Sequence, residues 1–396
     1  MGDEARIGTL AVWAGEEETG WQNATQVPVV HSVSFGYPDL EQWLRVAKAE
    51  EPGHIYSRQS NPTVQAFEEK VRALEGAEAA TSFSTGMAAI ASTFFGLLSS
   101  GDRIVSTKDT YGGTSKLFLE FFPRLKMEAT LCETSDPEAI EAAIARGCRI
   151  VYLETPTNPT MKVIDLARFS QAAHDVGALL VVDNTLATPV NQRPLELGAD
   201  LVVHSATKFL GGHADALGGV VCGKRDLVQQ ISHYREITGP SLHPMAAYFL
   251  LRGTKTLHLR IRQQNASALE IARYLEKHSA IEQVYYPGLV SDPHHELARR
   301  QMSGFGGVLS FKLKGGFETV RQFLPRLRYA HLAANLGSVE TIAGPPATTS
   351  HVELTSEERE SLGIPEGLVR YSVGIEDTED LIADLRQALE AVSGRT

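Results

Sequence analysis

The chain has few cysteines, no long apolar run and no excess of positive charge. Its 396 residues include only three cysteines, Cys132, Cys148 and Cys222, which are too few and too scattered for a disulfide framework. We therefore expect free thiols in a reducing compartment, the cytoplasm. No apolar run approaches the roughly 18 residues that span a bilayer. The net charge of −11 disfavours nucleic acid as a partner, because its phosphate backbone is also negative. We expect neither a membrane nor a nucleic-acid partner.

Three common catalytic motifs are also missing. The segment "GGVVCGK" (218–224) approaches a phosphate-binding loop, but Arg225 stands where Ser or Thr would hold Mg²⁺. It also reads as a strand rather than as the start of a helix. Neither HExxH nor a paired-cysteine spacing accompanies the 13 histidines, so we expect no metal site. The absence of GxSxG disfavours an α/β-hydrolase.

What is present is a regular alternation of strands and helices. The pattern predicts helices at 62–76 and 165–177, and short strands at 102–107, 148–154, 178–183 and 199–205. Continuous apolar strands between helices indicate a mostly parallel sheet covered on both faces, an α/β fold. We predict an N-terminal arm over 1–60, a main domain over 61–255 and a smaller α+β domain over 256–396.

Polar side chains follow three of the predicted strands. Asn158 lies after the strand that ends at Glu154, Asp183 ends another, and Thr207 and Lys208 follow a third that ends at Ser205. In parallel sheets, ligands bind beyond the carboxyl ends of the strands. The three strand ends therefore predict one site.

A lysine and an aspartate at neighbouring strand ends suggest pyridoxal 5'-phosphate. This cofactor needs a lysine, a carboxylate opposite its pyridine nitrogen and a cradle for its phosphate. Lys208 and Asp183 are the candidates, with Gly86 and Met87 opening an apolar helix and Tyr111 supplying a ring. Each residue taken alone has a plainer reading: Asp183 as a helix cap, Gly86 and Met87 as part of a capped helix start, and Tyr111 as a core tyrosine.

Taken together, the motifs resemble those of a known family. They run in order over nearly the whole chain: "YSRQSNPT" (56–63), "STGMAAI" (84–90), "TYGGT" (110–114), "ETPTNP" (154–159), "VVDNT" (181–185), "HSATKFLGGHAD" (204–215) and "LVRYSVGIED" (368–377). The chain resembles the transsulfuration, or Cys/Met metabolism, family of pyridoxal-phosphate enzymes. The resemblance implies the fold type I, aspartate-aminotransferase-like architecture, an amino-acid substrate and a homotetramer built from dimers.

The resemblance also implies roles for individual residues. Lys208 matches the Schiff-base lysine and proton shuttle, Asp183 the partner of the pyridine nitrogen, and Tyr111 the ring that stacks on the cofactor. Arg370 matches the arginine that binds the substrate carboxylate. The remaining positions match cofactor contacts at the phosphate cradle and the ring hydroxyl: Gly86, Met87, Ser205, Thr207 and Asn158.

The N-terminal arm is implied to act across a dimer. Tyr56 and Arg58 match residues that reach the cofactor phosphate of the neighbouring subunit, and Tyr56 also lies on the substrate side. The arm would then complete the partner's site, which accounts for its weak periodicity.

The substrate is less well indicated. Cystathionine-handling members carry acids at positions where this chain has Ile55 and Ala334, and Asn335 is more similar to the O-acylhomoserine sulfhydrylases. Pro345 departs from the common pattern, whereas Gly113 is similar to the cystathionine enzymes and not to methionine γ-lyases. We expect γ-replacement on an activated homoserine by a thiol or sulfide. The alternative is γ-elimination from methionine, cystathionine or a related amino acid.

Two other classes remain at this point. A catalytically silent pyridoxal-phosphate protein would lack the lysine, aspartate or arginine, and all three are present. A fold relative that performs transamination or racemisation would lack the "YSRQSNPT" arm motif, which is also present.

Overall fold

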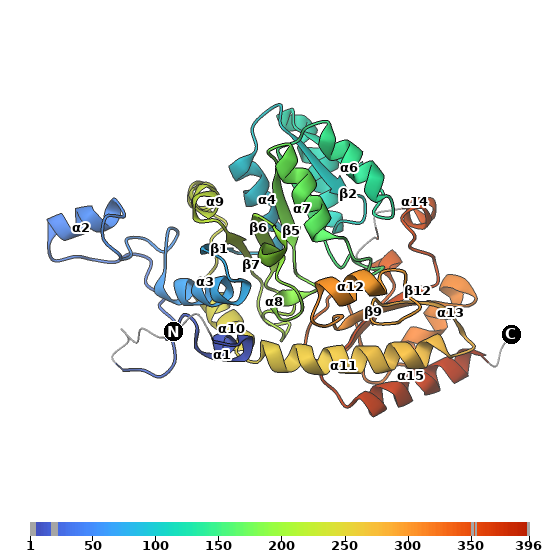
Figure 1. Ribbon diagram of the computed structural model, residues 1–396. Helices are drawn as coiled ribbons and strands as arrows, with labels where there is room; N and C mark the ends of the chain where they lie inside the picture. The colour runs from blue at the N-terminus through green and yellow to red at the C-terminus, as the bar shows by residue number, and fades with distance from the viewer. Residues whose placement is uncertain (1–4, 17–22, 350–351, 353–354, 394–396) are drawn as a thin grey trace.

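The computed structural model describes residues 5–16, 23–349, 352 and 355–393. Of the predicted arm, residues 1–4 and 17–22 lie outside the described residues. Two sheets form the framework, the first from strands within residues 79–223 and the second from strands within residues 281–372 (Figure 1). The limits at 60 and 255 stay a prediction, although every strand of the second sheet follows residue 280.

The larger sheet has seven strands in the order β1-β7-β6-β5-β4-β2-β3. Strands β2 to β6 run parallel, whereas β7 is antiparallel to both β1 and β6. The prediction of a mostly parallel sheet is therefore confirmed. The strands are β1 (Ala79–Phe83), β2 (Arg103–Thr107), β3 (Glu128–Cys132), β4 (Ile150–Glu154), β5 (Leu179–Asp183), β6 (Leu201–Ser205) and β7 (Gly219–Gly223).

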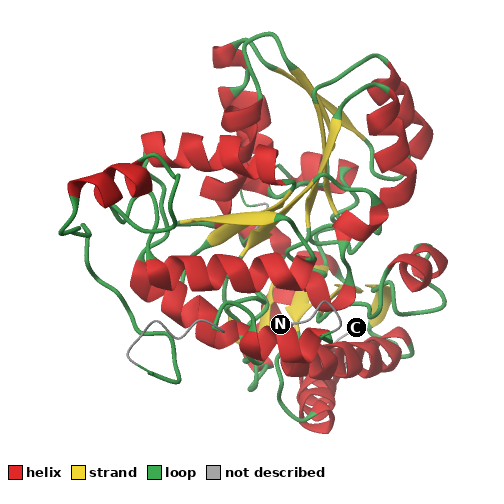
Figure 2. Ribbon diagram, turned by 60° about the vertical axis from the view of Figure 1, so that its left-hand side comes forward, coloured by secondary structure: helices red, strands yellow, loops and turns green. Residues whose placement is uncertain are grey.

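Helices cover both faces of this sheet, as Figure 2 shows. Successive residues of a strand point to opposite faces, so Val181 of β5 packs with the helices of one layer and Val182 with those of the other. This is why the strands read as unbroken apolar runs. One layer contains α4 (Gly86–Leu97) and α9 (Arg225–Thr238); the other contains α3 (Pro62–Glu75), α6 (Pro137–Ala145), α7 (Leu166–Asp175) and α10 (Pro244–Thr254).

Helix α3 shows how local sequence sets its limits. The Asn61 side chain accepts a hydrogen bond from the Thr63 N–H at 3.0 Å, and Pro62 occupies the first helical position. Gly76 ends the helix with φ of 69°, in the left-handed region that favours glycine. The predicted helix is confirmed to within one residue.

The second sheet has the order β10-β11-β12-β9-β8. Its apolar side packs on the long helix α11 and on the last helix, α15, forming a core of its own. The elements are α11 (Leu257–Glu276), β8 (Ile281–Tyr285), β9 (Val308–Leu313), α13 (Gly316–Phe323), β10 (His331–Leu332), β11 (Ile342–Gly344), β12 (Leu368–Ser372) and α15 (Thr378–Ser393).

Shorter elements connect these layers. They are α5 (Gly112–Lys116), α8 (Thr188–Asn191), α12 (His295–Gln301), α14 (Ser356–Ser361), a π-helical turn at Leu117–Phe121, and 3₁₀ turns at Pro123–Leu125, Pro194–Leu197, Leu324–Arg326 and Pro346–Thr348. Over the described ranges, no helix has the length and apolar character to cross a membrane.

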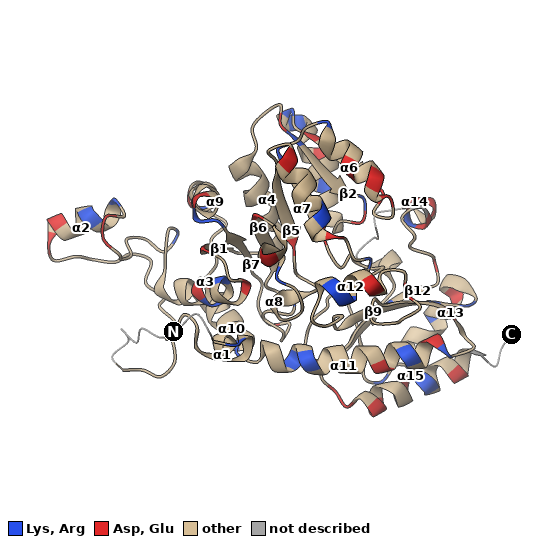
Figure 3. Cartoon of the chain, viewed as in Figure 1, with Lys and Arg blue, Asp and Glu red and all other residues tan. Residues whose placement is uncertain are grey.

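The N-terminal segment contains α1 (Ile7–Trp13) and α2 (Leu40–Ala47). Helix α2 stands well away from the rest of the chain at the far left of Figure 1. Its Leu40, Trp43 and Leu44 are 75%, 42% and 54% exposed, and their spacing puts them on one face of the helix. The helix also contains one acidic and one basic residue, Glu41 and Arg45. Figure 3 shows charges of both signs on α2. An exposed apolar face on a protruding helix marks an interaction surface.

Candidate active site

A cavity of about 270 Å³ lies at the carboxyl ends of β4, β5 and β6. The parallel register places Glu154 opposite Asp183 and Asp183 opposite Val203, so these strand ends meet at one edge. Nine of the residues predicted from the sequence line this cavity: Gly86, Met87, Tyr111, Asn158, Asp183, Ser205, Thr207, Lys208 and Arg370.

Lys208 lies just beyond β6, at the turn that the glycines of "FLGG" close. Its Nζ donates a hydrogen bond to Oδ1 of Asn335 at 2.6 Å. Burial, with a smaller contribution from the Arg370 charge, lowers the pKa of Lys208 to about 8. A lysine with this pKa is partly neutral near physiological pH, so its nitrogen can act as a nucleophile or accept a proton.

This lowered pKa predicts a pH dependence of stability. Lys208 has a pKa of about 8 in the folded chain, against an ordinary value of 10.5, so the folded chain binds fewer protons between those values. Stability therefore rises with pH across that window. In cofactor-free protein we expect the free energy of unfolding to rise by about 3 kcal/mol more than in Lys208→Met. Urea titrations of both proteins between about pH 7 and 10.5 measure this difference. Parallel pH profiles would contradict it.

Asp183 is a buried carboxylate, 6% exposed, at the end of β5. It accepts hydrogen bonds from the Thr185 N–H at 3.0 Å and from the Tyr152 hydroxyl at 3.1 Å. No lysine or arginine of the described residues forms an ion pair with it. A buried carboxylate is costly without a charged partner, and a protonated pyridine nitrogen would supply one.

The start of α4 forms the third side of the cavity. Thr85 caps the helix by accepting the Ala88 N–H at 3.0 Å, whereas within the described chain the N–H groups of Gly86 and Met87 have no acceptor. A Cβ at Gly86 would lie 2.7 Å from Cβ of Ser205, so only glycine lets the helix start approach the end of β6 this closely. Free N–H groups at a helix N-terminus bind phosphate, and the hydroxyls of Ser205 and Thr207 line the same pocket.

Arg370 enters the cavity from β12 of the second sheet. Its guanidinium donates to Oδ1 of Asn158 at 3.1 Å and to the backbone oxygen of Asn335 at 3.0 Å. It is 5% exposed, and burial lowers its pKa to about 10. Among the described residues it has no carboxylate partner, so it is suited to bind a substrate carboxylate through its planar fork.

Tyr56 and Arg58 do not reach this cavity within the same chain. The Arg58 guanidinium lies over the Tyr56 ring at 5.0 Å and donates to the backbone oxygen of Glu236 at 3.0 Å. Arg58 lines a separate hollow at the base of the arm. Their predicted role across a dimer stays a prediction.

The sequence reasoning missed part of the cavity wall. Its apolar lining includes Ile90, Leu186, Leu217 and Leu336, which come from four separate segments and carry no local signal. Glu154 was noticed only as a strand end, although it is 3% exposed and lines the cavity. Its position beside Asp183 in the register is the signal that could have identified it.

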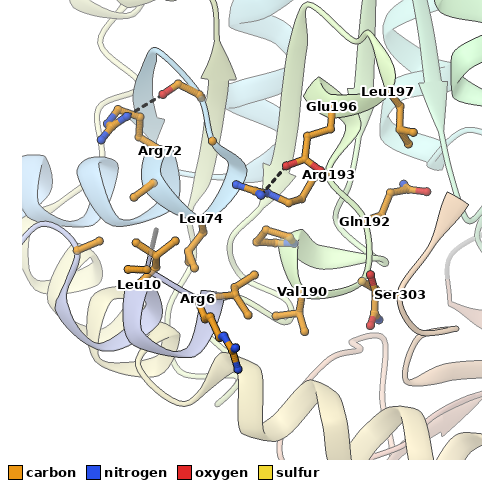
Figure 4. Close-up of a pocket in the computed structure, with 18 of the residues that line it drawn as sticks. Arg6, Leu10, Arg72, Leu74, Val190, Gln192, Arg193, Glu196, Leu197 and Ser303 are labelled. Atoms are coloured by element: carbon orange, nitrogen blue, oxygen red, sulfur yellow. Dashed lines mark hydrogen bonds and ion pairs between the residues drawn. The ribbon is translucent and has the colours of Figure 1, made fainter. Parts of the chain in front are cut away.

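A second cavity, of about 660 Å³, lies between α1, α3 and the segment that follows α8 (Figure 4). Its Arg72 and Arg193 are already paired with glutamates three residues away, Glu69 and Glu196. None of the predicted site residues lines it. The larger cavity therefore lacks the chemistry of the smaller one.

The site combines a lysine that is partly neutral near physiological pH, a carboxylate that no described lysine or arginine pairs with, and a helix that begins at a glycine. These three features suit pyridoxal phosphate, and they define the class of pyridoxal-phosphate enzymes. The family model for Cys/Met metabolism PLP-dependent enzymes matches residues 8–390. The chain belongs to this family, and pyridoxal 5'-phosphate is its cofactor. It is an enzyme of γ-synthase and γ-lyase type that acts on an amino acid.

Relatives in this family carry different activities. The L-methionine gamma-lyase of Fusobacterium nucleatum subsp. polymorphum is 43% identical over 389 residues, which cover 98% of each chain. The O-succinylhomoserine sulfhydrylase of Pseudomonas aeruginosa is 41% identical over 388 residues, covering 98% of this chain and 96% of the relative. The solved cystathionine gamma synthase of Xanthomonas oryzae pv. oryzae, in complex with aminoacrylate and cysteine, has a TM-score of 0.94 and 38% identity, covering 99% of this chain and 100% of that one.

Proposed function

We propose that this enzyme performs γ-replacement on an O-acyl-L-homoserine, with a thiol or sulfide as the incoming nucleophile. The observation that carries the proposal is the loop that contains Ala334, Asn335 and Leu336. It lines the cavity with apolar side chains and places an uncharged amide oxygen 2.6 Å from Nζ of Lys208. An uncharged wall suits a small acyl group or thiol better than a substrate with a distal charge, because an unpaired charge there would be desolvated.

Each residue of the cavity has a task in this reaction. Pyridoxal phosphate, when bound, stabilises the negative charge that develops on the substrate carbons next to the amino group. Arg370 binds the α-carboxylate and fixes the orientation of the substrate. Nζ of Lys208 takes the α-proton, gives it up again and, once neutral, takes a β-proton, a task suited to its pKa of about 8. The Tyr111 hydroxyl delivers a proton to the group that leaves the γ-carbon.

The proposed contacts to the cofactor follow the same geometry. Asp183 would hold the pyridine nitrogen, and Asn158 would contact the ring hydroxyl. Gly86, Met87, Ser205 and Thr207 would form the phosphate cradle, as their placement around the start of α4 supports.

The reaction can be identified by its products. Purified enzyme loaded with cofactor is incubated with O-acetyl-L-homoserine, with and without a thiol, and the products are analysed by mass spectrometry. We expect a new thioether to form faster than 2-oxobutyrate. Release of 2-oxobutyrate alone would overturn γ-replacement in favour of γ-elimination.

γ-Elimination is the second candidate, because the L-methionine gamma-lyase relative is as similar to this chain as the sulfhydrylase relative. In this reaction the same proton transfers lead to a 2-oxo acid and ammonia. Methionine is the substrate to test next, since its methylthio group also fits an uncharged wall.

We further propose that the site is completed across a homodimer, with dimers paired into a tetramer. Two features support the shared site of the dimer: Tyr56 and Arg58 lie outside their own chain's cavity, and α2 exposes an apolar face. We also propose the cytoplasm as its compartment, since Cys132, Cys148 and Cys222 are all free.

The shared site predicts complementation between two inactive variants. One variant is Lys208→Ala, and the other carries Tyr56→Ala with Arg58→Ala. In a mixed dimer, the lysine of the second chain meets the intact arm of the first. Subunits mixed in equal amounts should therefore recover about a quarter of the wild-type activity. Each variant mixed with itself is the control, and no recovery despite confirmed mixed dimers would show that the arm acts elsewhere.

A further inference from the structure

Glu154 is a buried carboxyl in the cavity to which the reaction above assigns no task. It ends β4 and lies directly opposite Asp183 in the register of the sheet. Burial, and then the nearby Asp183 charge, raise its pKa well above the ordinary range. No lysine or arginine in the described part of the chain forms an ion pair with it. Such a placement costs stability, which points to a role for the carboxyl in the site.

Its contacts lead to two residues of the site. Oε2 of Glu154 accepts a hydrogen bond from the Tyr111 N–H at 2.9 Å. The nearby backbone N–H of Asn158 acts against the effect of burial and lowers the pKa of the same carboxyl. Tyr111 lies 43 residues before Glu154 in the sequence, on the loop between β2 and α5. One carboxyl therefore ties the end of β4 to the loop that leaves the neighbouring strand β2.

The loops after β2 and β4 both carry side chains that need a fixed position. The Tyr111 side chain is 44% exposed, and no side-chain hydrogen bond within the described residues holds its ring, so its backbone sets its direction. The Asn158 side chain is the partner of Arg370, at 3.1 Å. A shift of either loop would move the ring or the guanidinium relative to the cofactor and the substrate.

We propose that Glu154 is a positioning residue that sets the Tyr111 ring against the cofactor and the Asn158 amide against Arg370. This inference rests on the assignment of Tyr111 in the proposed function. Glu154 acts through the backbone N–H of Tyr111 and the nearby backbone of Asn158, and it touches no reacting atom. Loss of the hydrogen bond to Tyr111 frees that loop while the sheet itself stays intact.

The test uses the holoenzyme with Glu154→Gln, which keeps the length of the side chain but replaces one carboxyl oxygen with an NH₂ group that cannot accept a backbone N–H. We expect kcat/KM to fall about 10- to 100-fold, the effect of a misplacement of about 1 Å. The circular dichroism band of the bound cofactor should change, because the ring beside the cofactor moves. The cofactor dissociation constant should rise.

Asp200→Asn is the matched control. Asp200 is also a buried carboxylate, 2% exposed, and it also holds a backbone N–H, that of Leu180 at 2.9 Å. It lies just before β6, at the amino end of the parallel strands, whereas Glu154 lies at their carboxyl end. We expect this variant to lower the melting temperature without changing the cofactor band. If Glu154→Gln behaves like Asp200→Asn, with only a stability loss, Glu154 has no positioning role.

A double-mutant cycle with Tyr111→Phe tests whether Glu154 acts through Tyr111, and it also tests the role proposed for Tyr111 itself. If Glu154 acts through Tyr111, the two substitutions are non-additive in kcat/KM, whereas Asp200→Asn and Tyr111→Phe are additive. Additivity of Glu154→Gln with Tyr111→Phe overturns the inference. If Tyr111→Phe alone leaves activity and cofactor band unchanged, the assignment of Tyr111 in the proposed function is wrong instead.

Discussion

Lys208→Ala is expected to lower turnover of O-acetyl-L-homoserine by about 10⁴-fold or more, because it removes a nucleophile and two proton transfers together. The nitrogen is held 2.6 Å from Asn335 and its pKa is lowered to about 8. No other lysine lines the cavity, so none of the lining residues can replace it. Product formation followed by mass spectrometry measures the loss.

Two further variants make this result specific. Lys208→Arg keeps the positive charge but cannot lose its proton near neutral pH, so we expect it to be inactive as well. Lys224→Ala removes a lysine that pairs with Asp200 away from the cavity, and we expect it to retain activity. Millimolar amounts of a small primary amine should partly restore turnover of Lys208→Ala. Substantial activity of Lys208→Arg would mean that a charge, not a transferable proton, is what the site requires.

Arg370→Lys is expected to lower kcat/KM by about 100-fold or more, mainly through a higher KM. Truncating one side of a buried, hydrogen-bonded charge pair costs about 2–5 kcal/mol. An ammonium group cannot reproduce the two parallel hydrogen bonds of the guanidinium. Because this interaction binds the substrate carboxylate in the ground state and in the transition state alike, KM should change more than kcat. Initial rates over a wide range of substrate concentration separate the two parameters.

A buried arginine elsewhere in the same half of the chain serves as the control. Arg359 is 8% exposed and pairs with Glu366, so Arg359→Lys should lower stability without raising KM. An unchanged KM in Arg370→Lys, with activity otherwise normal, would place the carboxylate contact on another residue. The amine analogue of the substrate, which lacks the carboxylate, should be turned over equally poorly by wild type and Arg370→Lys.

The central part of the site could be predicted from local sequence because strand topology follows from it. Apolar runs that alternate with helices indicate a parallel sheet, and the carboxyl ends of parallel strands share an edge. Asp183, Ser205 and Lys208 therefore had to lie near one another once β5 and β6 were neighbours. The glycine that begins α4 could also be recognised from the local sequence, since a close backbone approach requires glycine at that position.

The remaining contacts could not be read from any pattern, because they join residues far apart in the chain. The hydrogen bond between Arg370 and Asn158 spans 212 residues, and that between Lys208 and Asn335 spans 127. For Arg370, only the family resemblance indicated a role. The role of Glu154 could be inferred only from the structure. There, the sheet register places it opposite Asp183, and its carboxyl contacts the Tyr111 loop.

By itself, then, the sequence determined the parallel sheet, the edge that carries the chemistry and the family to which the enzyme belongs. These depend on periodicity and on short motifs, which short-range physics can encode. Only the tertiary structure decided how deeply Lys208 is buried, which groups hold Arg370 and which apolar side chains form the cavity wall. Burial and dielectric environment arise when two sheets pack together, and they set the pKa values on which the proposed proton transfers depend.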